Sequence, residues 1–188
     1  MPSLDHFGII APFYDRAIPL KASQHLIELI GLPIEGAILD AGGGTGRVAQ
    51  TFAHLAARVV VADLSIGMLS QARQKGGLWP VCSETESLPF PDASFERIVM
   101  VDALHHVFSQ KKTVNELWRV LKSGGRIVIE EPDVRKLSVK FVALFEKITL
   151  MRSHFIAPPQ IVTMFAHLNA TTQIELDGFN AWVIVDKN

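Results

Sequence analysis

A run of glycines behind an acidic residue is the part of this sequence best suited to hold a ligand. The segment reads Asp40, Ala41, Gly42, Gly43, Gly44, Thr45, Gly46, and a short apolar stretch precedes it. Glycine lets the backbone turn tightly and approach a bound molecule closely. In an open parallel sheet, ligands bind beyond the carboxyl ends of the strands, where the strand order reverses. The pattern therefore predicts a strand, a ligand-binding loop and a helix.

The positions of the glycines narrow the type of cofactor. A dinucleotide fingerprint G-x-G-x-x-G that starts at Gly42 fails, because Arg47 stands where the third glycine belongs. A later register over Gly44, Gly46 and Ala49 fits the looser form that ends in alanine, so a nicotinamide cofactor stays open as an alternative. A P-loop fails because no lysine followed by serine or threonine closes the loop. An adenosine ligand without a pyrophosphate fits best.

A second acidic residue ends the next apolar run. Asp63 follows three consecutive valines and an alanine, the place where a carboxylate can accept hydrogen bonds from ribose hydroxyls. The alternative is a structural role at the start of the helix predicted from Ile66.

The elements that would position these residues alternate between short apolar runs and helix-spaced patterns, as in an α/β fold with a parallel sheet. Strands are predicted at residues 37–40, 58–63, 79–83, 96–102 and 126–131. Helices are predicted at 20–30, 47–55, 66–74 and 113–121. Residues 171–176 and 181–185 flank Asp177-Gly178 and predict a hairpin, which requires one antiparallel strand at the edge of the sheet.

Several segments, taken in order, resemble one enzyme family. They are Phe13-Tyr14-Asp15, Asp40–Gly46, Asp63, Glu84–Asp92, Leu104-His105-His106 and Leu117–Glu131. This series resembles the class I S-adenosylmethionine-dependent methyltransferases, especially the ubiquinone/menaquinone-biosynthesis type (methyltransferase type 11). Two residues depart from the family pattern: Glu84 stands where aspartate is usual before the adenine, and Ser123 replaces proline before the double glycine.

The resemblance implies a Rossmann-like seven-stranded mixed sheet in the order 3-2-1-4-5-7-6, with strand 7 antiparallel and helices on both faces. It implies S-adenosylmethionine as cofactor and S-adenosylhomocysteine as product. The cofactor contacts it implies are Tyr14, Asp40, Ala41, Gly42, Gly43, Gly44, Gly46, Asp63, Leu64, Met68, Glu84, Thr85 and Asp102. We expect a single domain over residues 1–188, with an N-terminal helical segment at 1–35 and a helical lid or acceptor segment at 134–168.

Methyl transfer is an in-line displacement, so the protein must mainly align and desolvate the acceptor. A base is needed only where the acceptor loses a proton. The candidates are His105, His106, Glu131 and Asp133, and we favour His106. His105, His106, Glu131 and His154 could ligate a metal by type, but their spacings match no known ligand pattern, so no metal is expected.

Composition limits the remaining options. The chain of 188 residues has a formal charge of −1, which argues against a nucleic-acid partner, and Cys82 is the single cysteine, which fits a reducing cytoplasmic location. We expect a small-molecule acceptor, no membrane span, and no secretion signal among residues 1–19. Residues 135–155 have an amphipathic pattern that suits core, acceptor pocket, dimer contact or membrane surface. A homodimer, an RNA or protein methyltransferase, and a scaffold without turnover stay open.

Overall fold

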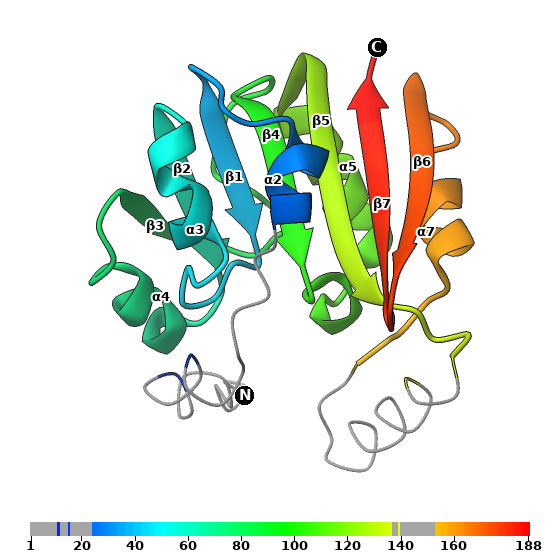
Figure 1. Ribbon diagram of the computed structural model, residues 1–188, viewed down its shortest axis with the longest axis horizontal. Helices are drawn as coiled ribbons and strands as arrows, with labels where there is room; N and C mark the ends of the chain where they lie inside the picture. Colours follow the sequence, from blue (N-terminus) through cyan, green and yellow to red (C-terminus); the bar gives the residue numbers. More distant parts are fainter. Residues whose placement is uncertain (1–10, 12–14, 16–23, 137–138, 140–152) are drawn as a thin grey trace.

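The computed structural model describes residues 11, 15, 24–136, 139 and 153–188, which build a seven-stranded sheet with helices on both faces (Figure 1). The strands are β1 (Ala37–Ala41), β2 (Arg58–Asp63), β3 (Leu78–Cys82), β4 (Phe95–Val101), β5 (Leu121–Pro132), β6 (Ala170–Asp177) and β7 (Asn180–Lys187). The helices are α2 (Gln24–Ile30), α3 (Ala49–Phe52), α4 (Ile66–Ala72), α5 (Gln110–Val120) and α7 (Pro158–Met164), with short 3-10 helices η1 (Ala53–Leu55) and η2 (Leu104–His106).

The strand order is β3-β2-β1-β4-β5-β7-β6, which confirms the predicted topology. β1 pairs in parallel with β2 on one side and with β4 on the other. The strands before and after β3 are therefore added on opposite sides of β1, which makes the end of β1 the point where the strand order reverses. β7 runs antiparallel to both β5 and β6, as the short turn around Asp177-Gly178 requires. The glycine loop therefore begins where ligands bind in open α/β sheets.

The two faces of the sheet carry separate apolar layers. Ile38 of β1 packs in the layer that contains α2, α3 and α4, whereas its neighbour Leu39 packs in the layer of α5 and α7. Successive strand residues point to opposite faces, so a parallel strand covered on both sides must be apolar throughout. This explains the unbroken run Val59–Ala62 in β2, in which all four residues are buried.

The free edge at β3 is short and contains a proline. Pro80 lies in register with Val61 of β2 and has no backbone N–H to offer. Trp79 beside it is 58% exposed, and the guanidinium carbon of Arg58 lies 5.2 Å from the Trp79 ring centroid. No other strand of the described residues pairs with this edge, and the missing N–H of Pro80 removes one donor from the strand.

The structure corrects several predicted boundaries. β5 begins at Leu121, whereas the sequence predicted a strand only from residue 126 and a helix up to residue 121. The pairing of β5 with β4 shifts register between Phe95 and Arg97, which accommodates the extra residues of β5. Gly124, one of these extra residues, has a φ of 73°. The helix predicted over 47–55 is a short α3 followed by η1. Cys82 is the exposed last residue of β3.

Some predictions fall outside the described residues. They include Tyr14, most of the N-terminal helical segment, and the amphipathic pattern between 140 and 152. Within the described part of the 134–168 segment, residues 153–157 are not helical and α7 follows them. Across the residues that the structure describes, no helix has the length and apolarity that a membrane crossing needs.

Candidate active site

The glycine loop is shaped by close packing at its start and is open in the middle. Gly42 has a φ of 70°, and a Cβ added there would lie 2.7 Å from the Cβ of Ala103. Its N–H donates to the carbonyl of Ala62 over 2.7 Å. A Cβ added to Gly44 would meet, among the described residues, only Asp63 Oδ2 at 3.9 Å. The loop can therefore receive a ligand beside Gly44, whereas Gly42 packs closely against Ala103, which follows β4.

Asp63 joins the glycine loop to the start of α4. Its Oδ2 accepts a hydrogen bond of 2.9 Å from the N–H of Gly44, and its Oδ1 accepts one of 2.8 Å from the N–H of Ser65. The helix cap itself is Ser65, whose hydroxyl accepts from the N–H of Met68. A carboxylate offers about four lone-pair positions, so Asp63 can hold the loop and also accept bonds from ribose hydroxyls.

Asp40 is a buried carboxyl beneath the loop, with 1% of its surface exposed. Burial, followed by the nearby charge of Asp63, raises the pKa of Asp40 to about 7, although the Ala49 amide and Arg47 act in the opposite direction. Within the described part of the chain, its Oδ2 has no hydrogen-bond partner. A buried, unsatisfied carboxyl oxygen suits a site that receives a positively charged ligand.

A contact that sequence reasoning missed ties the N-terminal segment to this loop. Thr45 Oγ1 donates to Asp15 Oδ1 over 2.5 Å, and Lys75 Nζ donates to both Asp15 Oδ2 and the Thr45 carbonyl, each over 2.6 Å. Burial would raise the pKa of Asp15, but the hydrogen bonds from Lys75 and Thr45 outweigh burial and lower it. The only signal in the sequence was the position of Asp15 after Tyr14 in a family-like motif.

The segment predicted to flank the adenine is fixed to the start of α5. Thr85 is buried, with its Oγ1 at 3.1 Å from that of Thr113, while Glu84 is exposed. Glu86 Oε1 accepts from the N–H of Ser109, so this acid caps α5 in place of the Ser109 side chain. The exposed Glu84 and the anchored Thr85 fit their predicted place beside a ligand.

Arg119 holds the rest of that segment. Its guanidinium donates to the carbonyls of Leu88 and Phe90 over 3.0 and 2.8 Å, and it also pairs with Glu116 and Asp92. One arginine on α5 thus fixes the path of residues 88–92.

Glu131, at the end of β5, organises the turn after β4. Its Oε1 accepts hydrogen bonds from the N–H groups of Ala103 and Leu104 over 3.1 and 2.7 Å. Its Oε2 lies 2.6 Å from Nδ1 of His105. Both side chains are almost completely buried, Glu131 at 3% and His105 at 2% exposed. His105 is therefore held by an acid that sequence reasoning had considered as a base or a metal ligand.

The two histidines also contact the segment that precedes α7. The ring of Phe155 stacks on His105 with centroids 4.2 Å apart, and the His106 ring lies 4.0 Å away at 45°. Ser153 Oγ lies 3.2 Å from Nδ1 of His106, and the N–H of His154 donates to the carbonyl of His105. Burial, followed by the charge of His105, lowers the pKa of His106 to about 3, so its ring is neutral near pH 7.

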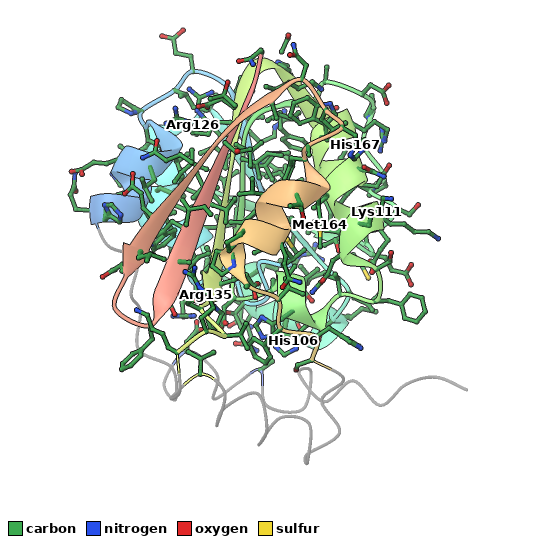
Figure 2. The ribbon with its side chains drawn as sticks, turned by 90° about the vertical axis from the view of Figure 1, so that its right-hand side faces the viewer. His106, Lys111, Arg126, Arg135, Met164 and His167 are labelled. Atoms are coloured by element: carbon green, nitrogen blue, oxygen red, sulfur yellow. The ribbon has the colours of Figure 1, made fainter. Side chains whose placement is uncertain are left out.

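The other acid near the end of β5 is committed to an ion pair. Asp133 accepts hydrogen bonds from the backbone N–H, Nε and a terminal nitrogen of Arg135, and these contacts lower the pKa of Asp133. Figure 2 shows His106 and Arg135 towards the end of the molecule opposite Arg126, which lies in the middle of β5. Among the described residues, no three His, Cys, Asp or Glu side chains come together to hold a metal ion.

The remaining predicted residues lie along the same edge of the sheet. Leu64 is 62% exposed directly after β2, whereas Met68 in α4 is buried. Asp102 is exposed after β4 with a φ of 54°, and its N–H donates to the carbonyl of Glu130. The predicted contacts that the structure describes therefore follow the ends of β1, β2, β3 and β4, with Met68 one turn into α4. Their roles in binding stay predictions.

Comparison with known proteins supports this arrangement. Residues 39–129 match the family model described as a methyltransferase domain. The ubiquinone/menaquinone biosynthesis C-methyltransferase UbiE of Enterobacter sp. (strain 638) is 33% identical over 130 residues, covering 62% of this chain and 52% of that protein. The chain spans about half the length of the curated relatives that it matches.

Solved structures share the fold at lower sequence identity. A chain from the complex of the Haloferax volcanii Trm112 methyltransferase activator with a methyltransferase has a TM-score of 0.81 at 15% identity, covering 98% of both chains. A SAM-dependent methyltransferase from Thermotoga maritima has a TM-score of 0.77 at 21% identity, covering 97% of this chain and 98% of its own.

The strand order, the glycine loop bonded to Asp63 and the methyltransferase domain model matched over residues 39–129 together support a class I S-adenosylmethionine-dependent methyltransferase. Among the curated relatives that it matches, the similarity is to proteins of the UbiE type, as the family-like motifs had indicated.

Proposed function

We propose that this chain transfers a methyl group from S-adenosylmethionine to a small, partly apolar metabolite, and that the metabolite is a reduced quinone precursor. The observation that carries the proposal is the hydrogen bond from Gly44 to Asp63 above the buried carboxyl of Asp40. It creates an open, acidic cradle at the reversal point of the sheet. The names of the UbiE relatives supply the quinone class.

Different residues of this cradle would bind different parts of the cofactor. Asp63 is placed to accept hydrogen bonds from ribose hydroxyls, and Thr85 lies beside the predicted adenine site. Asp40 has a pKa of about 7 in the free protein, and a positively charged ligand nearby would favour its ionised form. Bound S-adenosylmethionine would supply an electrophilic methyl group on a positively charged sulfur. None of these residues need react, because binding and alignment account for most of the rate of such a displacement.

The acceptor side combines apolar surface with one polar pair. Phe155 and Ile156 are partly buried, with Phe155 stacked on His105 and Ile156 packed against the α5 layer. His106 beside Ser153 is the polar element of this wall. In the reaction the acceptor atom bonds to the methyl carbon as the carbon–sulfur bond breaks, and the proton of the acceptor passes to a base or to water. His106 is our candidate for receiving it because it lies beside Ser153 on this wall, although a pKa of about 3 makes its ring a weak base near pH 7.

We further propose a cytoplasmic enzyme that acts without nucleic acid. The formal charge of −1 supports this, because a phosphate backbone requires a surplus of basic residues. The alternatives are an RNA or protein substrate, a cofactor-binding scaffold without turnover, and assembly as a homodimer. An acceptor screen and a measurement of mass in solution separate these alternatives.

Calorimetric titration with S-adenosylmethionine and S-adenosylhomocysteine tests the cofactor, with NAD as the control ligand. We expect binding to the wild type that weakens by roughly 30-fold or more in Asp63→Ala, because hydrogen bonds to a charged group contribute about 1.5–3 kcal/mol each. Transfer of a labelled methyl group to 1,4-naphthohydroquinone, compared with bulk tRNA, tests the acceptor class. Absence of binding by the folded wild type would refute the proposal, and labelling of tRNA alone would replace the acceptor.

A further inference from the structure

Glu131 is the point at which three chain segments meet. It belongs to β5, its oxygens bind the backbone and ring of residues 103–105, and the His105 ring in turn carries Phe155 from the segment before α7. The carboxylate is 3% exposed, so its charge is stabilised by these donors and not by water. Removing that charge would leave the two backbone N–H groups and the imidazole without their ionic acceptor.

The contact also fixes the state of His105. An ionised carboxylate only accepts hydrogen bonds, so the His105 Nδ1 that lies 2.6 Å away must carry a proton. The ring is thereby held in one orientation, with Phe155 stacked nearly parallel at 17°. The His106 ring packs against the His105 ring, and its Nδ1 lies within hydrogen-bond distance of Ser153 Oγ. Glu131 thus determines where His106 sits without touching it.

This cluster adjoins the predicted cofactor site. Ala103, whose N–H is bound by Glu131, is the residue that a Cβ on Gly42 would meet at 2.7 Å. Residues 103–106 therefore border the glycine loop, so the acceptor wall and the predicted cofactor site adjoin. Gln110 adds a second tie, because its amide donates to the carbonyls of both Leu104 and His154.

We propose that Glu131 is a positioning residue for methyl transfer: through His105 it sets the wall formed by His106, Ser153 and Phe155 against which the acceptor is aligned. It governs the rate of transfer and leaves cofactor affinity nearly unchanged, because Asp40, Asp63 and Thr85 lie outside its contacts. This inference rests on the proposed function, since it concerns the acceptor side of the same site.

The test compares Glu131→Gln with the wild type, with Glu96→Gln as a matched control. Glu96 also accepts a hydrogen bond from a backbone N–H, that of Ala37, and pairs with a cation, Lys122. It lies at the start of β4, whereas the residues bound by Glu131 follow the end of β4. With 1,4-naphthohydroquinone as acceptor, we expect kcat of Glu131→Gln to fall about 100-fold, because a displacement near 1 Å can cost that much. The Kd for S-adenosylhomocysteine should change less than about threefold, and Glu96→Gln should retain kcat.

A second measurement needs no acceptor. The charge of His105 helps to keep His106 deprotonated, and Glu131 stabilises that charge. In Glu131→Gln we therefore expect the pKa of His106, followed by NMR of the imidazole, to rise, and the Nδ1 proton signal of His105 to shift or vanish.

The outcomes separate the two proposals. A wild-type protein that binds no S-adenosylhomocysteine refutes the proposed function. A wild type that binds the cofactor, together with a Glu131→Gln variant of unchanged kcat, overturns the positioning role. Where the wild type does not methylate 1,4-naphthohydroquinone, an unchanged titration of His106 overturns it instead.

Discussion

Asp40 should impose a pH dependence on the stability of the fold. Its pKa is about 7 in the folded protein, against an ordinary value of 3.8, because burial and the charge of Asp63 oppose ionisation. Between these two values the folded state binds a proton that the unfolded chain has released, so stability falls as pH rises. At about 1.4 kcal/mol per pKa unit, the full effect is roughly 4 kcal/mol, absent below about pH 4 and complete above about pH 7.

The substitution Asp40→Asn removes the ionisation and keeps the shape of the side chain. The backbone amide of Ala49, which interacts with Asp40, can donate to the new carbonyl oxygen. The added NH2 group is a buried donor and costs about 1–3 kcal/mol at every pH. Between pH 5 and pH 8 we therefore expect the wild type to lose about 2–3 kcal/mol relative to the variant, whichever protein is more stable at pH 5.

Urea unfolding of the ligand-free protein at several pH values measures this difference. Asp177→Asn, at the exposed hairpin end, serves as the control and should follow the wild type. The reasoning is refuted if the curves of free energy against pH for the wild type and Asp40→Asn run parallel. That result would mean that Asp40 is ionised in the folded protein throughout this range.

Three further substitutions test the frame of the site. Gly42→Ala should lower the free energy of unfolding by about 2–4 kcal/mol, since it combines a positive φ with a 2.7 Å approach to Ala103, and urea unfolding measures it. Thr45→Val should cost about 1 kcal/mol by the same assay, because Asp15 loses one donor and retains Lys75; no loss at all would contradict the contact. Arg119→Met should cost about 1–2 kcal/mol and weaken binding of S-adenosylhomocysteine in calorimetry, and unchanged binding would show that residues 88–92 do not shape the site.

The sequence was sufficient for the parts of the site that depend on local pattern. The apolar run that ends at Asp63 and the glycines that follow Asp40 are each a contiguous stretch of sequence. The strand, the loop and the helix that they form could therefore be predicted from local pattern. The antiparallel edge followed from the short turn at Asp177-Gly178, and the sheet confirms it. These features are encoded by neighbours along the chain.

The side-chain contacts between distant segments could not be predicted in this way. Asp15, Thr45 and Lys75 are separated by about thirty residues each, and nothing in their local sequence joins them. Glu131 was considered as a base because it lies at the end of the predicted fifth strand, but that position cannot reveal that its oxygens accept hydrogen bonds from Ala103, Leu104 and His105. Such contacts depend on the folded packing of strands that are adjacent only in space.

The proline in β3 has a consequence for how this protein meets other chains. An open strand edge is a template for pairing with another copy, and a missing N–H at Pro80 interrupts that template in the middle of a five-residue strand. The opposite edge, β6, has eight residues and contains no proline. In a concentrated solution, strand pairing between two copies should therefore be disfavoured at β3 and should begin at β6.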